Sequence, residues 1–184
     1  YGIVANGQLV YAGSTGMANV TMNTRATPKT LFRIASMSKS FTAMAILKLR
    51  DEGRLSLSDA VEKYIPEMKK AGVLTSDAPP ITVHHLLTMS AGFPEDNPWG
   101  DRQLDARDEE LLQLLSKGLS FSNAPGLTFE YSNLGFALLG KIISNISGVP
   151  YQQYITNTIM KPIGMNDSKW EYAEVPADQL ALGY

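Results

Sequence analysis

The sequence FRIASMSKSFTAMAIL, residues 32–47, carries the clearest structural pattern in this chain. Met37, Phe41 and Met44 recur in it at the spacing of one helical face, and further apolar residues fill most of the circumference. The pattern predicts a helix over about Ser36–Glu52. Because a helix that is apolar nearly all round is usually buried, we expect this one to lie at the centre of the molecule.

Two polar residues, Ser36 and Lys39, open this predicted helix. Residues three apart lie on one helical face, so Lys39 can reach back to Ser36. A serine hydroxyl needs a neighbouring base to take its proton, and a buried lysine can act as that base. With 15 serines and 10 lysines in 184 residues, about 0.8 such pairs arise by chance. The alternative, a capping serine and a solvated lysine, therefore stays open.

A second polar group, EYSN at residues 130–133, precedes another strongly apolar stretch that predicts a buried helix. Tyr131 can relay a proton there, and the Asn133 amide can hold a substrate amide through both its donor and its acceptor. The eight tyrosines and nine asparagines predict about 0.4 such pairs by chance. The alternative is that Tyr131 packs against the core while Ser132 or Asn133 caps the helix.

The first residues of the chain, YGIVANGQLVYAG at 1–13, predict two short strands. They flank Asn6-Gly7, a pair that suits a tight type I′ turn. The remaining patterns are almost all helical. Since a lone hairpin is marginal in water, the chain reads as the front part of a fold whose other strands come later.

Composition excludes several classes of function. The net charge is −2 and no basic stripe is present, which argues against nucleic acid and anionic membranes as partners. No apolar run approaches the roughly 18 residues of a membrane-spanning segment. The chain has no cysteine, so disulfides and thiolate metal sites are excluded.

Two further groups of polar residues carry weaker signals. His84 and His85 are neighbours on a predicted short helix, so they point in different directions, and neither has a partner at metal-ligand spacing. We expect a structural role for them. The acid-rich stretch PEDNPWGDRQLD, residues 94–105, lacks the pattern of an EF-hand and predicts a surface loop near the site. Trp99 in that loop can touch a substrate or simply pack.

Four stretches together resemble one family closely. It is the serine β-lactamase and penicillin-binding-protein superfamily in its class C-like branch, which includes class C β-lactamases, D-alanyl-D-alanine carboxypeptidases, D-aminopeptidases and family VIII-type esterases. The resemblance runs over essentially the whole chain. The stretches are LFRIASMSKSFTAMAIL (31–47), ITVHHLLTMSAGFP (81–94), FEYSNLGFALLGKII (129–143) and MKPIGMNDSKW (160–170).

The resemblance implies an α/β fold, α+β in layer terms. An antiparallel sheet is flanked by helices, and a mostly helical subdomain is inserted after the nucleophile helix. Residues 1–57 would form the start of the α/β domain with the nucleophile helix, and residues 58–184 the mostly helical subdomain. The later strands of the α/β domain are absent from this chain.

The resemblance also assigns roles to four residues. Ser36 matches the acylated nucleophile, and its backbone N–H would form half of the oxyanion hole. Lys39 matches the lysine that helps to deprotonate the serine. Tyr131 matches the proton shuttle, and Asn133 the amide that contacts the substrate. The site would lie in a cleft, with Ser36 and Lys39 on one wall and Tyr131 and Asn133 on the other, and neither a metal nor an organic cofactor is expected.

Two features of the family are missing from this sequence. Its third motif, Lys-Thr-Gly or His-x-Gly, is not found, because SKGL at residues 116–119 has the wrong order. The long helix that usually precedes the hairpin is absent too. These departures favour an incomplete copy of a family member over a short paralogue.

The function implied by the resemblance is that of a serine hydrolase with an acyl-enzyme mechanism on an amide, ester or β-lactam carbonyl of a small-molecule or peptide substrate. One alternative is a module that binds or senses penicillin or cell-wall peptide without efficient turnover, and another is a scaffold that borrowed the fold. The family favours a periplasmic or secreted setting. Peptidase, esterase and β-lactamase are not distinguished, and neither is the oligomeric state.

Overall fold

The computed structural model describes residues 1–97 and 106–183, and the chain divides into two compact units. The smaller unit is Tyr1–Met37 with Gly164–Tyr184, and the larger is Ser38–Ile163. These boundaries differ from the predicted division at residues 57 and 58. That division concerns the fold of a longer protein and stays a prediction.

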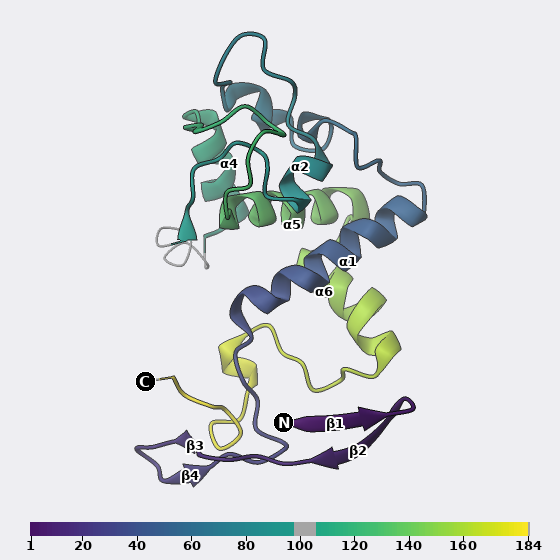
Figure 1. Ribbon diagram of the computed structural model, residues 1–184, viewed down its shortest axis with the longest axis vertical. Helices are drawn as coiled ribbons and strands as arrows, with labels where there is room; N and C mark the ends of the chain where they lie inside the picture. The colour runs from purple at the N-terminus through teal and green to yellow at the C-terminus, as the bar shows by residue number, and fades with distance from the viewer. Residues whose placement is uncertain (98–105, 184) are drawn as a thin grey trace. The chain divides into compact units, whose positions relative to one another are not determined.

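The smaller unit begins with the expected hairpin (Figure 1). Strands β1 (Gly2–Ala5) and β2 (Gln8–Ala12) pair antiparallel. Between them Asn6 and Gly7 have φ of +50° and +74°, as a type I′ turn requires. The predicted turn is confirmed.

A second, unpredicted hairpin follows in the same unit, formed by β3 (Met17–Asn19) and β4 (Thr24–Arg25). The end of the chain returns to it. Leu31 and Leu180 form a parallel bridge, and the Leu182 N–H donates to the Ala18 carbonyl. Strands this short carry too weak a period to be recognised from sequence.

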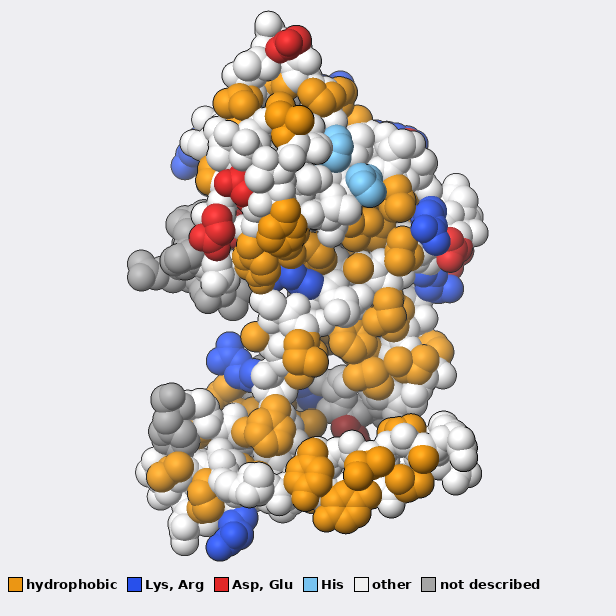
Figure 2. Space-filling model, in the orientation of Figure 1, with side chains coloured by type: hydrophobic (Ala, Val, Ile, Leu, Met, Phe, Trp, Pro, Cys, Tyr) orange, Lys and Arg blue, Asp and Glu red, His pale blue; other side chains and the backbone are white. Residues whose placement is uncertain are grey.

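Apolar side chains are exposed on the first hairpin, and Figure 2 shows them gathered over it. They come from alternating and consecutive positions alike, so both faces of the two-stranded sheet are apolar. Such a strand pattern is typical of a sheet that is covered on both faces. The exposed residues are Ile3, Val4, Leu9, Val10 and Tyr11.

The larger unit is helical and is built around α5 (Asn133–Ser147), which lies against several other helices (Figure 1). In the described residues, α5 packs against α1 (Ser38–Asp51), α2 (Val83–Leu87) and α6 (Tyr151–Ile155). It is also joined to α4 (Asp108–Ser116) by an ion pair, in which Lys141 Nζ donates to Asp108 Oδ2 at 2.7 Å.

Shorter turns connect these helices. Helix α6 continues as a π-helical turn and then a 3₁₀ turn, and two further 3₁₀ turns follow α1 in the chain. A last one lies in the smaller unit. In chain order they are Val61–Lys63, Pro66–Lys70, Thr156–Met160, Lys161–Ile163 and Tyr172–Glu174.

The core of the larger unit includes aliphatic side chains from α1, α2, α4, α5 and α6. Burial of each such side chain stabilises the fold by about 1.5–3 kcal/mol. None of the helices in the described residues is long and apolar enough to cross a membrane. Fully buried core residues include Ile46, Leu49, Leu86, Leu138, Leu139 and Ile142.

Helix α1 differs from its prediction in two ways. It begins at Ser38, because Ala35–Met37 forms a 3₁₀ turn instead of the first α-helical turn. It is also buried along one face only, and Met44 is 41% exposed. Within the larger unit α1 packs against α5 and α6, and these cover that one face.

A hydrogen-bonded pair of loops leads to the start of α5. The N–H groups of Glu130, Gly126 and Ser122 donate to the carbonyls of residues 89, 90 and 92 in turn. Gly92 makes the closest approach. Its φ is +83°, and a Cβ built there would lie 2.1 Å from the Asn123 carbonyl oxygen.

We therefore expect Gly92→Ala to lower the free energy of unfolding by roughly 3 kcal/mol, since left-handed backbone costs about 1–2 kcal/mol and overpacking a further 1–3. Gly148→Ala is the matched control, because Gly148 has φ +77° and open space around a Cβ. It should cost only about 1 kcal/mol. Urea unfolding of both variants measures the difference, and equal losses would contradict the steric argument.

Candidate functional site

Lys39 is the centre of a small polar cluster in the larger unit. It lies in the first turn of α1 and is half-buried. Its Nζ donates to Tyr131 Oη at 2.7 Å and to Asn133 Oδ1 at 2.6 Å. The structure thus brings together three of the four predicted site residues, although Lys39 lies more than ninety positions from the other two in sequence.

The start of α5 presents both acceptors to Lys39. Ser132 is the N-cap, and its Oγ accepts from the Gly135 N–H at 3.0 Å. Tyr131 therefore stands on the loop just before the helix, while Asn133 occupies its first turn. The predicted helix and its cap are confirmed. Since α1 packs against α5, the two helices hold the lysine and its acceptors together.

Aromatic rings surround the lysine ammonium. Nζ lies 4.7 Å from the centre of the Tyr131 ring and 5.7 Å from that of Phe136. Aromatic faces attract a cation and at the same time exclude water. Lys39 therefore has a partly desolvated setting in which its hydrogen bonds are stronger than at the surface.

The other nitrogen of Asn133 has a different environment. Within the described part of the chain, Nδ2 is buried and has no hydrogen-bond partner. An unsatisfied buried donor costs roughly 1–3 kcal/mol, so such groups are rare in folded proteins. This amide can donate to an acceptor on a ligand.

Ser36 lies in the smaller unit, in the 3₁₀ turn that leads directly into α1. Its side chain is exposed. The residue before it, Ala35, has φ +44°, a left-handed conformation that is uncommon for alanine. Strained backbone of this kind clusters at functional sites, which makes this turn notable independently of its sequence motif. The predicted roles of all four residues stay predictions.

Asp96 is a residue of the cluster that sequence reasoning missed. The sequence places it among the acids of a predicted surface loop, yet its carboxylate accepts from the backbone N–H groups of Asn133 at 2.7 Å and Leu134 at 2.8 Å. No periodicity marks such a residue. The other predicted features of that loop, Trp99 among them, fall in residues 98–105, outside the described residues.

The two histidines lie on α2, as expected. The His85 Nδ1 accepts from the Thr82 N–H at 3.2 Å, which completes a capping box at the start of the helix. Burial lowers the pKa of His85, and the neighbouring His84 lowers it further. Because protonation removes the Nδ1 acceptor, this hydrogen bond is present at neutral pH and is lost as the pH falls through the lowered pKa. The bond from the His85 N–H to Thr82 Oγ1 does not depend on the protonation of the ring. In the described residues no group of three or more His, Asp or Glu could hold a metal ion.

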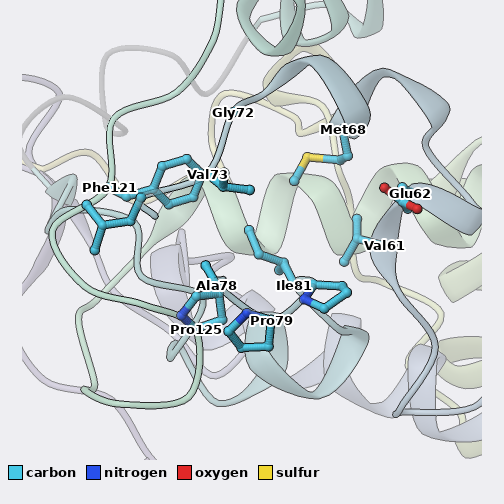
Figure 3. Close-up of a pocket in the computed structure, with 12 residues that line it drawn as sticks. Val61, Glu62, Met68, Gly72, Val73, Ala78, Pro79, Ile81, Phe121 and Pro125 are labelled. Carbon is cyan, nitrogen blue, oxygen red and sulfur yellow. The ribbon is translucent and has the colours of Figure 1, made fainter. Parts of the chain in front are cut away.

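A shallow apolar hollow lies elsewhere in the larger unit (Figure 3). Its volume of about 70 Å³ is far below the roughly 300–1,000 Å³ of ligand pockets. It contains none of the predicted site residues. Its lining includes Val61, Met68, Val73, Ile81, Phe121 and Pro125.

Comparison with known proteins assigns the family. A family model described as "Beta-lactamase" matches residues 1–184. The chain belongs to the beta-lactamase family. Its fold is therefore of the β-lactamase/transpeptidase type, and the family places it in the superfamily of serine hydrolases and penicillin-binding proteins.

Individual relatives of this beta-lactamase family member agree. Protein flp of Staphylococcus aureus is 35% identical over 184 residues, which are 99% of this chain and 36% of the relative. The octameric penicillin-binding protein homologue from Pyrococcus abyssi is 39% identical with a TM-score of 0.81, covering 97% of this chain and 42% of its own. A β-lactamase/D-alanine carboxypeptidase from Yersinia pestis is 29% identical with a TM-score of 0.77, covering 94% and 50%. The chain thus spans about 36% of the length of the curated relative.

Proposed function

We propose that this chain carries the nucleophile and the proton-transfer groups of a serine hydrolase that works through an acyl-enzyme. The observation that carries the proposal is the contact of Lys39 Nζ with both Tyr131 Oη and Asn133 Oδ1. The Ser-x-x-Lys and Tyr-x-Asn motifs each arise easily by chance, but here both residues of the second motif accept a hydrogen bond from the lysine of the first. The substrate would be an amide, ester or β-lactam carbonyl of a small molecule or peptide.

The first chemical step is attack by Ser36 Oγ on the carbonyl carbon. Its proton passes to the pair formed by Lys39 and Tyr131, which accepts it either as an amine beside a phenol or as an ammonium beside a phenolate. The two heavy atoms, at 2.7 Å, are close enough for a proton to move between them. The tetrahedral intermediate then collapses, and the leaving group takes up that proton. The product is an ester of Ser36 with the acyl part of the substrate.

The second step releases the acyl group. Water attacks the ester carbonyl, gives up a proton to the same pair, and Ser36 regains its hydrogen as the acid leaves. The Ser36 backbone N–H would stabilise the oxyanion in both steps, and each such donor supplies about 3–4 kcal/mol. The chemistry asks for no metal or organic cofactor.

The unpaired Asn133 amide supports a preference within this reaction class. Nδ2 is a buried donor beside Lys39, and a substrate carbonyl would satisfy it. An amide next to the reacting carbonyl has such an oxygen at a suitable distance, whereas a simple alkyl ester has none. We therefore favour acylamino substrates, as in peptides and penicillins.

The nucleophile is tested by intact mass of the complete natural protein before and after treatment with a serine-directed fluorophosphonate. We expect one adduct in the wild type and none in Ser36→Ala. Ser40→Ala is the matched control, because Ser40 is exposed on α1, and it should keep the adduct. An adduct that survives in Ser36→Ala would refute the assignment. With a β-lactam as the probe, an adduct that never hydrolyses would favour the binding or sensing module over the enzyme.

The Asn133 preference is tested with the p-nitrophenyl esters of N-acetylglycine and of pentanoic acid, two acyl chains of equal length that differ in the amide. In Asn133→Ala we expect kcat/KM to fall by about 10-fold or more for the acylamino ester relative to the alkyl ester, since one hydrogen bond to a buried group is worth about 1–3 kcal/mol. Equal losses on both esters would mean that Asn133 acts only through Lys39.

A further inference from the structure

Asp96 contacts every residue of the segment 131–134. Its backbone N–H donates to the Tyr131 carbonyl at 3.3 Å. Its carboxylate accepts from Ser132 Oγ at 3.2 Å and from the N–H groups of Asn133 and Leu134 at 2.7 and 2.8 Å. One residue, 37 positions before Asn133, thus fixes the whole turn that opens α5.

Capping alone does not account for this arrangement. Ser132 already serves as the N-cap of α5, with its Oγ on the Gly135 N–H. At the N-terminus of a helix, the free backbone N–H groups are generally satisfied by one capping side chain and by water. Here the N–H groups of Asn133 and Leu134 both go to a carboxylate from a distant loop, which is a tertiary tether of the helix start.

Asp96 holds both of the residues that accept hydrogen bonds from Lys39. Tyr131 is held by Asp96 at its backbone carbonyl and by Lys39 at its hydroxyl. Asn133 is held by Asp96 at its backbone N–H and by Lys39 at its side-chain oxygen. A shift of the helix start by about 1 Å would lengthen bonds of 2.6 and 2.7 Å past the hydrogen-bond range.

The loop that carries Asp96 is itself anchored. Its first residues pair with the segment that runs into Tyr131: the Gly126 N–H donates to the Ser90 carbonyl at 2.8 Å, and the Ser122 N–H to the Gly92 carbonyl at 3.0 Å. Asp96 can position the start of α5 only if the loop that carries Asp96 is itself held in place. These backbone hydrogen bonds hold that loop.

We infer that Asp96 is a positioning residue that sets the geometry of Lys39 with Tyr131 and Asn133, and so the rate of Ser36 acylation. The inference rests on the proposed function. An aspartate is suited to the task because both carboxylate oxygens accept, so one side chain serves two adjacent N–H groups. An asparagine of the same shape would turn one of those acceptors into an N–H₂ that faces a donor.

The test is the kinetics of acylation of the complete natural protein by a fluorophosphonate, followed by mass. In Asp96→Asn we expect the rate constant to fall by 10-fold or more, while the fraction of molecules finally labelled stays that of the wild type. A merely structural role would lower the labelled fraction and leave the rate constant of the folded molecules unchanged. That result would overturn the inference.

Glu110→Gln is the matched control. It makes the same acid-to-amide change at the start of α4, where a Glu110 oxygen accepts from the Arg107 N–H at 2.8 Å. Its rate constant should equal that of the wild type. If Asp96→Asn lowers the labelled fraction, Asp96→Glu decides the matter, because it keeps the charge but moves it by one methylene. If Asp96→Glu is labelled completely but slowly, the positioning role is supported. If it is labelled at the wild-type rate, the inference is wrong.

A second readout separates this inference from the proposed function. The ¹³Cζ chemical shift of Tyr131 reports the hydrogen bond from Lys39 and needs no activity. If the wild type is not acylated at Ser36 but Asp96→Asn shifts the Tyr131 signal, the proposed function fails and the positioning of Tyr131 by Asp96 stands. If Asp96→Asn leaves the signal and the acylation rate unchanged, the inference is wrong.

Discussion

The polar cluster of the larger unit depends on one requirement, that a half-buried lysine at the start of α1 must find acceptors. An ammonium that is partly removed from water is costly unless it is hydrogen-bonded. Tyr131 and Asn133 supply the acceptors at 2.7 and 2.6 Å, and both stand at the start of α5. Because α1 and α5 also pack through their aliphatic faces, the apolar core and the polar cluster fix the same pair of helices.

Further contacts hold the start of α5 in the position at which it meets Lys39. Ser132 caps the beginning of α5, and Asp96 ties the same turn to a loop that is itself held by backbone hydrogen bonds. Gly92 lets that loop approach the opposite backbone where no side chain would fit. Around Lys39 the larger unit therefore has two part-buried hydrogen bonds and a carboxylate that holds the helix start from which both acceptors come. Polar networks whose members are satisfied make the groups that they connect more rigid.

The sequence predicts those features whose causes are local. The hairpin turn at Asn6-Gly7, the start of α5 and its Ser132 cap follow from neighbouring residues and are found as expected. Asp96 was not recognised, because its role comes from contacts with residues some 37 positions away. The burial of α1 was overestimated for a related reason. A periodic pattern tells which side chains are apolar, but only the neighbours decide which of them are covered.

We propose that Lys39 and Tyr131 act as one proton-transfer unit. A double-mutant cycle with Lys39→Met and Tyr131→Phe, measured as the rate constant of Ser36 acylation in the complete natural protein, tests it directly. Residues that act as a unit are strongly non-additive. We expect the double variant to be about as slow as the slower single variant. If the two losses multiply instead, the lysine and the tyrosine work independently, and their contact at 2.7 Å does not carry the chemistry.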